Sequence, residues 1–321
     1  MNQPSHNPQR FTNKVVIVTG AAQGIGQGVA LQVAAEGGLV VLVDRSDYLD
    51  QVHQEIIAAG QTATMIKADL ETFEGAQSVA DHAIETFGQI DILINNVGGA
   101  IWMKPFEQFG ADEIMKEINR SLMPTMWCCR AVLPQMLTQQ GGVIVNVSSV
   151  ATRGINRVPY SAAKGGVNAL TAALAFEHAK DNIRVNAIAT GGTEAPPRKT
   201  PRNPVPPTEQ EQAWMQEVVD QTKDRTFMKR YGTINEQVNA ILFLASDDAS
   251  YITGTVVPVG GGDQGVELFA SQSFRNRLYG HFRVDLCQRS LAGQYFRLAD
   301  TVLCMQDLAL QVGQVDQIGR A

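Results

Sequence analysis

Short, uninterrupted apolar runs alternate with stretches of helical periodicity along this chain, and this alternation restricts the fold more than any other feature. Continuous apolar runs are typical of strands buried on both faces, and parallel strands need a crossover long enough to hold a helix. The runs are Val15–Val18, Val40–Val43, Ile92–Ile94, Val143–Val147 and Val185–Ile188, and helical spacing covers Ile25–Glu36, Phe73–Phe87 and Ser161–His178. We expect an α/β fold: a doubly wound parallel sheet in a three-layer α/β/α sandwich.

The composition is that of a globular chain that handles small molecules. Hydrophobic residues make up 44% of the 321 residues and charged residues 18%, which excludes disorder and fibrous repeats. With 26 basic and 32 acidic residues the net charge is −6, so no nucleic-acid partner is expected. No apolar run approaches the roughly 20 residues that cross a bilayer, and Met1–Arg10 lacks the apolar core of a secretory signal. We expect a cytoplasmic protein with no membrane contact.

The cysteines suggest neither a disulfide framework nor a metal site. The chain has four, Cys128, Cys129, Cys287 and Cys304, and no two of them have CxxC spacing. We expect reduced core thiols and no bound metal.

A glycine-rich turn follows the first apolar run. Residues 19–26 read Thr-Gly-Ala-Ala-Gln-Gly-Ile-Gly and lead into a helical stretch. Such glycines let the backbone approach a pyrophosphate held at the helix N-terminus, although an ordinary strand-to-helix turn has the same appearance. Asp44 follows about 20 residues later, where a carboxylate binds the adenosine ribose and repels a 2′-phosphate. This predicts NAD rather than NADP, although Arg45 follows immediately and could in principle neutralise a phosphate. The expected cofactor contacts are Gly20, Gln23, Gly24, Ile25, Gly26 and Asp44.

A second group of residues suits acid–base chemistry on an alcohol. Ser148 and Ser149 end one apolar run, and Tyr160 precedes Lys164 by four residues at the start of a helix. Side chains four apart share a helix face, so the Lys164 ammonium can favour the ionised form of Tyr160. A tyrosinate can remove the alcohol proton while hydride leaves the same carbon, with a serine hydroxyl holding the substrate oxygen. The YxxxK spacing alone is common, and its occurrence with the glycine turn and Asp44 makes it specific.

Five features in this order resemble the short-chain dehydrogenase/reductase family. They are TGxxxGxG at 19–26, Asp69 after a short strand, Asn95-Asn96-Val97-Gly98, the serine pair, and Tyr160xxxLys164. The resemblance extends from Phe11 to about Gly262. It implies a Rossmann-type fold with one NAD-binding domain over residues 11–264, and a homo-oligomer, either tetramer or dimer.

The resemblance also implies roles for individual residues. Asp69 and Leu70 are expected to bracket the adenine. Asn96 and Gly98 are expected to line the cofactor cleft, and Lys164 to bind the nicotinamide ribose as well as assist Tyr160.

Longer segments resemble one branch of the family, the bacterial benzoate and toluate cis-diol dehydrogenases. They lie at residues 95–102, 104–106, 127–129, 147–154 and 192–195. This resemblance implies NAD-dependent oxidation of 1,2-dihydroxycyclohexa-3,5-diene-1-carboxylate to catechol, with release of carbon dioxide and NADH, in aromatic-compound degradation. The alternatives are a family member acting on another alcohol or ketone, such as an oxoacyl or sugar alcohol substrate, and a non-catalytic nucleotide-sensing protein.

The chain departs from the family pattern at three points. The serine lies closer to Tyr160 than is usual, and alignment from the strand side selects Ser149. Counting back from Pro134 places Ser121, rather than Asn119, at the family's helix asparagine, so Ser121 or a water is expected to replace it in the proton relay. Thr190-Gly191-Gly192 stands where Pro-Gly is usual, which leaves the cofactor amide contact open.

A carboxylated substrate needs a cationic anchor, and the planar fork of arginine matches a carboxylate. Arg153 and Arg157 lie between the serine and the tyrosine, and Arg198 and Arg202 lie on a proline-rich segment. We expect Ser148, Ser149 and at least one of these arginines to contact substrate. The alternative for each arginine is a solvated surface position.

Two regions interrupt the strand–helix alternation. Residues Thr193–Thr208 carry six prolines, which excludes helix and central strand. A long loop in a compact domain is often a lid, so we expect a lid at about 193–230, with a solvated surface loop as the alternative. Residues 265–321 contain arginine but no lysine and have no counterpart in the resemblance. We favour an extension without chemistry over amphipathic helices that dock on a neighbouring subunit.

Overall fold

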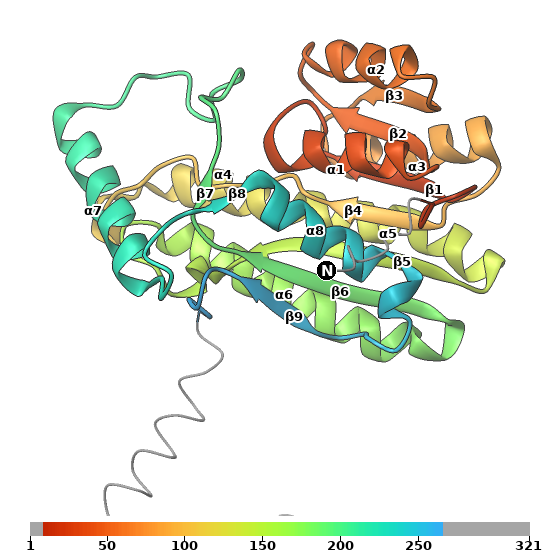
Figure 1. Cartoon of the computed structure of the whole chain (residues 1–321). Helices are drawn as coiled ribbons and strands as arrows, with labels where there is room; N and C mark the ends of the chain where they lie inside the picture. The colour runs from red at the N-terminus through yellow and green to blue at the C-terminus, as the bar shows by residue number, and fades with distance from the viewer. Residues whose placement is uncertain (1–8, 266–321) are drawn as a thin grey trace, which may run out of the picture. The chain divides into compact units, whose positions relative to one another are not determined.

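A seven-stranded parallel sheet forms the centre of the protein in a computed structural model that describes residues 9–265 (Figure 1). The strand order is β3-β2-β1-β4-β5-β6-β9, and every neighbouring pair is parallel. The strands are β1 (Val15–Thr19), β2 (Leu39–Asp44), β3 (Ala63–Lys67), β4 (Ile92–Asn95), β5 (Gly142–Ser149), β6 (Ile183–Thr190) and β9 (Val256–Val259). All five apolar runs are strands of this sheet, so the predicted architecture is confirmed.

Helices cover both faces of the sheet. The helices are α1 (Gly24–Ala35), α2 (Leu49–Ala58), α3 (Phe73–Phe87), α4 (Ala111–Ser121), α5 (Met123–Gln139), α6 (Val158–His178), α7 (Glu209–Arg225) and α8 (Ile234–Ala245). Along β1, Val16 and Val18 pack in one cluster with α1, α2 and α8, whereas Val15 and Ile17 pack in a second with α3 and α5. Because successive strand residues face opposite sides, two covered faces require an unbroken apolar run. This is the physical origin of the sequence pattern.

The proline-rich segment leaves the sheet and returns to it. Its first residues form β7 (Thr193–Glu194), which pairs with β8 (Gly232–Thr233) in a separate two-stranded sheet. No helix or strand occurs between Glu194 and α7, as predicted. The Thr208 hydroxyl then accepts a hydrogen bond from the Glu211 N–H at 3.2 Å and begins α7. The pairing of β7 with β8 thus ties both ends of the excursion together.

The strand order places a crevice at the centre of the sheet. The chain moves outward from β1 to β3 and then crosses back to β4 on the other side of β1. Ligands of open α/β sheets bind outside the carboxyl ends of the strands at such a switch point. Asp44, Asn95, Ser149 and Thr190 all end strands at this edge.

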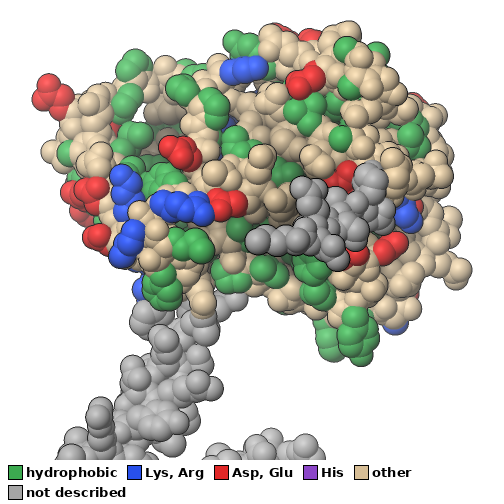
Figure 2. All heavy atoms as spheres, viewed as in Figure 1, with side chains coloured by type: hydrophobic (Ala, Val, Ile, Leu, Met, Phe, Trp, Pro, Cys, Tyr) green, Lys and Arg blue, Asp and Glu red, His purple; other side chains and the backbone are tan. Residues whose placement is uncertain are grey.

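Two of the four cysteines, the helices and one face of the surface can be compared with the expectations from sequence. Cys128 and Cys129 are free and buried on α5, and burial raises the pKa of the Cys129 thiol to about 12. No helix in residues 9–265 is long and apolar enough to cross a membrane. On the face shown in Figure 2, acidic and basic side chains lie beside one another with hydrophobic groups scattered between them. Cys287, Cys304 and the extension from 266 onward lie outside the described residues.

Candidate active site

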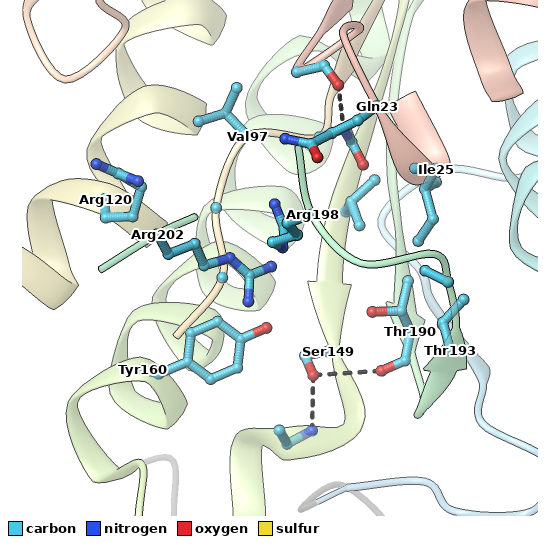
Figure 3. Close-up of a pocket in the computed structure, with 18 of the residues that line it drawn as sticks. Gln23, Ile25, Val97, Arg120, Ser149, Tyr160, Thr190, Thr193, Arg198 and Arg202 are labelled. Atoms are coloured by element: carbon cyan, nitrogen blue, oxygen red, sulfur yellow. Dashed lines mark hydrogen bonds between the residues drawn. The ribbon is translucent and has the colours of Figure 1, made fainter. Parts of the chain in front are cut away.

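One pocket at the carboxyl edge of the sheet collects most of the residues predicted from sequence. Its volume is about 640 Å³, and its central part is drawn in Figure 3. Gly26, Ser121 and Arg153 are not among its lining residues. The predicted residues that line it are Gly20, Gln23, Gly24, Ile25, Asp44, Asp69, Leu70, Asn96, Gly98, Ser148, Ser149, Arg157, Tyr160, Lys164, Arg198 and Arg202.

The glycine turn between β1 and α1 has the geometry that a pyrophosphate requires. Gly20 has a positive φ of 67°, and a Cβ on Gly26 would collide with the Gly20 carbonyl oxygen. The Asn96 side-chain amide donates to the Thr19 carbonyl at 3.1 Å and to the Gly20 carbonyl at 3.4 Å. Gly26 therefore supports the turn without lining the pocket, and Asn96, directly after β4, holds the turn by its side-chain amide.

The adenosine end of the pocket is lined by Asp44, Asp69 and Leu70. The Asp44 carboxylate accepts the Ala22 N–H at 3.2 Å and the Ser46 N–H at 3.0 Å. These bonds hold the carboxylate at the end of β2, and two of its four lone-pair sites remain for a ribose hydroxyl. The residues present thus fit an adenine dinucleotide.

Lys164 is a buried amine beside Tyr160. The residue belongs to α6 and is only 3% exposed. The Nζ donates to the Val147 carbonyl at 2.6 Å and lies 6.0 Å from the centre of the Tyr160 ring. Burial, reinforced by the charge of Arg202, lowers the pKa of Lys164 to about 7. The predicted Tyr–Lys pair is thus brought together with an amine that titrates near neutral pH.

The two serines that end β5 differ in orientation. The Ser149 hydroxyl accepts from the Ala151 N–H at 3.0 Å and donates to the Thr190 carbonyl at 3.3 Å, and Ser149 lies between Tyr160 and Thr190 (Figure 3). The Ser148 hydroxyl bonds to Asn168 Oδ1 at 2.5 Å and to the Lys164 carbonyl at 3.2 Å. Ser149 thus has the better placed hydroxyl for substrate, whereas Ser148 supports α6.

Ser121, rather than Asn119, lies close to Lys164. Ser121 is fully buried at the end of α4, and its hydroxyl accepts the Gly99 N–H at 3.2 Å. A Cβ on Gly98 would lie 3.6 Å from the Ser121 Cα and 3.1 Å from the Lys164 Nζ. Asn119 is exposed. The count from Pro134 thus selects the residue that the fold places beside the lysine.

Three of the four candidate arginines reach the pocket. Arg157, Arg198 and Arg202 line it, whereas Arg153 is exposed and outside it. Burial lowers the pKa of all three, that of Arg202 to about 10. The Nε atoms of Arg157 and Arg202 are buried without a hydrogen-bond partner among the described residues. In Figure 3 the Arg202 guanidinium lies next to the Tyr160 ring.

The proline-rich segment contacts the cofactor turn. The Lys199 N–H donates to Gln23 Oε1 at 3.0 Å, and the hydroxyls of Ser46 and Thr200 lie 3.0 Å apart. Lys199 Nζ also lies 5.0 Å from the centre of the Tyr48 ring. The segment therefore reaches across the first and second βα turns, which supports its assignment as a lid.

Sequence reasoning missed Arg120, which lines the pocket from α4. Its Nε donates to Glu71 Oε1 at 2.6 Å, and Arg45 Nη1 lies 3.7 Å from the same oxygen. Arg120 belongs to no motif, and the only signal was its position directly before Ser121. The ion pair connects α4 to the loop after Asp69, so it closes one wall of the cleft.

Comparison with known proteins agrees with this geometry. The model of the short chain dehydrogenase family matches residues 14–204. The chain belongs to the short-chain dehydrogenase/reductase family and is an oxidoreductase. It is 67% identical over 260 residues to the 1,6-dihydroxycyclohexa-2,4-diene-1-carboxylate dehydrogenase of Acinetobacter baylyi, covering 81% of this chain and all of that protein. A protein of the same name from Pseudomonas putida is 59% identical over 259 residues, covering 81% of this chain and 96% of its own length.

A solved structure supports the fold. NAD+-bound xylitol dehydrogenase is 30% identical with a TM-score of 0.70, and the match covers 79% of this chain and all of that one. The predicted fold and family are therefore confirmed.

Proposed function

We propose that the protein oxidises 1,6-dihydroxycyclohexa-2,4-diene-1-carboxylate with NAD, which yields catechol, carbon dioxide and NADH. With the ring numbered in the other direction, the same cis-diol is 1,2-dihydroxycyclohexa-3,5-diene-1-carboxylate. The 67% and 59% identical relatives bear the name of this activity. The structural observation that carries the proposal is the buried Arg202 guanidinium beside Tyr160, whose Nε has no hydrogen-bond partner among the described residues.

Tyr160, Lys164 and Ser149 have different roles in the proposed oxidation. Tyr160 takes the proton of the secondary carbinol, and Lys164 favours the phenolate by its charge. The Ser149 hydroxyl turns from the Thr190 carbonyl to the substrate oxygen. Bound NAD supplies the hydride acceptor. The product is a ketone β to the carboxylate, and the breaking C–C bond delivers its electrons to the ketone oxygen as carbon dioxide leaves, so the ring becomes aromatic without a dedicated residue.

We assign the substrate carboxylate to Arg202, with Arg157, which also lines the pocket, as a second contact. Both side chains have a buried Nε without a partner among the described residues. A buried donor without a partner is costly, and a carboxylate satisfies it bidentately. Arg198 lies between Arg202 and the glycine turn (Figure 3), closer to the cofactor end.

We propose NAD as the cofactor because Asp44 ends β2, lines the pocket and has acceptor capacity left for a ribose hydroxyl. A 2′-phosphate would face this carboxylate, and Arg45, the adjacent cation, lies against Glu71.

We also propose that the chain forms a homo-oligomer. Phe176 and Tyr251 are 93% and 102% exposed in the single chain, and an association surface would cover such side chains. Light scattering of the purified protein measures this directly.

Arg202→Ala tests the proposed function. Hydrogen bonds to charged groups contribute about 1.5–3 kcal/mol, so the KM for the carboxylated diol should rise roughly 10–100-fold. The KM for the neutral cis-1,2-dihydroxycyclohexa-3,5-diene should change less than about twofold. Arg153→Ala is the matched control, since this exposed arginine lies outside the pocket, and it should leave both values unchanged. Equal effects of Arg202→Ala on the two substrates would contradict the assignment.

A further inference from the structure

A carboxylate without a role in the reaction is buried behind the pocket. Glu117, in the middle of α4, is completely buried. Its Oε1 accepts the backbone N–H groups of Ile101 at 2.7 Å and Trp102 at 2.9 Å. Its Oε2 is buried without a hydrogen-bond partner in the part of the chain that the structure describes. Burying a carboxylate costs free energy, and the two backbone bonds offset part of this cost while they hold the loop at Ile101 and Trp102 in place.

The loop that Glu117 binds is the one on which Arg202 rests. Arg202 Nη1 donates to the Ala100 carbonyl at 3.4 Å. A Cβ on Gly99 would collide with the Arg202 guanidinium, so this group lies directly against the loop backbone. The backbone of this loop thus supports the guanidinium and determines how it is oriented in the pocket.

Two side chains of α4 hold this loop at both ends. Ser121 accepts the Gly99 N–H at 3.2 Å, and Glu117 accepts the N–H groups of Ile101 and Trp102. Glu117 and Ser121 are four residues apart and therefore share one face of the helix. Residues 99–102 are fixed to α4 on either side of the Ala100 carbonyl that Arg202 contacts.

Glu117 and Arg202 also interact electrostatically. Burial raises the pKa of Glu117, while the two backbone donors and then the charge of Arg202 lower it. In turn Glu117 is one of the groups that raise the pKa of Arg202 against the effect of burial. The two side chains are electrostatic neighbours across the loop.

We propose that Glu117 is a positioning residue for the carboxylate anchor: by binding the Ile101 and Trp102 amides it fixes the 99–102 loop, and through the loop it orients Arg202. The inference rests on the proposed role of Arg202 in substrate binding. It makes Glu117 a determinant of specificity for carboxylated over neutral diols, although Glu117 touches neither substrate nor cofactor.

Three variants of the full-length protein test the proposal on both diols. Glu117→Ala leaves both amides without an acceptor, and it should raise the KM for the carboxylated diol at least tenfold with kcat within threefold. Its KM for the neutral diol should stay within twofold. Glu117→Gln keeps an acceptor oxygen and should restore the KM for the carboxylated diol to within threefold of the wild type. If Glu117→Ala does not fold, Glu117→Asp, whose shorter side chain cannot reach both amides, should raise the same KM three- to tenfold.

Glu113→Gln is the matched control. Glu113 lies one turn earlier on α4 and pairs with Lys104, beyond the 99–102 loop, at 2.8 Å. This variant should leave the preference for the carboxylated diol unchanged. The proposal is overturned by a loss that is equal for both diols, by unchanged kinetics in Glu117→Ala and Glu117→Asp, or by a Glu117→Gln variant as impaired as Glu117→Ala. A wild-type enzyme with no preference for the carboxylated diol would instead contradict the proposed function itself.

Discussion

Replacing Lys164 with methionine should stabilise the apo-protein at neutral pH, and the gain should fade as the pH rises. The pKa of this amine is about 7 in the fold against an ordinary 10.5. The unfolded chain therefore binds the proton more tightly than the folded one, and the charge penalises folding at low pH. At about 1.4 kcal/mol per pKa unit the penalty is about 5 kcal/mol well below pH 7, about 4 kcal/mol at pH 7, and about 1 kcal/mol at pH 9.5.

Methionine fills a similar volume without the charge, but it leaves the Val147 carbonyl without the donor now 2.6 Å away. An unpaired buried acceptor costs about 1–3 kcal/mol at every pH. The net gain at pH 7 is therefore about 1–3 kcal/mol, and by pH 9.5 it should vanish or reverse.

Urea unfolding of wild-type and Lys164→Met apo-protein, at matched protein concentration between pH 7 and 9.5, measures this difference. Other titrating groups are common to both proteins, so their contributions cancel. The free energy of unfolding of the variant relative to the wild type should fall by about 3 kcal/mol across the range. A difference that stays constant with pH would refute the assignment of a neutral-range pKa to Lys164.

Three further predictions concern the reaction and the cofactor. Tyr160→Phe should keep NADH affinity, measured by fluorescence titration, while turnover drops roughly 10²–10⁴-fold, and more than a tenth of wild-type turnover would remove Tyr160 from the mechanism. Asp44→Ala should shift the ratio of kcat/KM for NAD over NADP at least tenfold toward NADP, and an unchanged ratio would place the discrimination elsewhere. Removal of residues 266–321 should leave turnover and NAD affinity within about twofold, because the catalytic residues all lie upstream; loss of either would make the extension a working part of the enzyme.

The sheet was predictable because burial on two faces leaves a direct trace in the sequence. Val15–Val18 is apolar throughout since its alternate residues pack into different clusters. The short β7 and β8 left no such trace. They are two residues each, and their pairing depends on where the excursion from 195 to 231 returns to the sheet.

The candidate site was predictable where the residues of one motif are close together in sequence. In the glycine turn and the Tyr160–Lys164 pair, and for Asp44 at the end of its strand, the local backbone fixes where each group lies. Arg120 and Glu117 were missed since their partners, Glu71 and the Ile101 and Trp102 amides, lie 15 to 49 residues away in sequence. Among the arginines, sequence suggested four equivalent candidates, and only the fold distinguishes the buried Arg202 from the exposed Arg153.

The proposed oxidation is tested most directly by supplying the purified protein with NAD and 1,6-dihydroxycyclohexa-2,4-diene-1-carboxylate, and by following NADH, catechol and carbon dioxide together. We expect the three products to form in equal amounts and the neutral cis-diol to be oxidised with a much higher KM. No NADH formation with the carboxylated diol, or equal kcat/KM for the two diols, would contradict it.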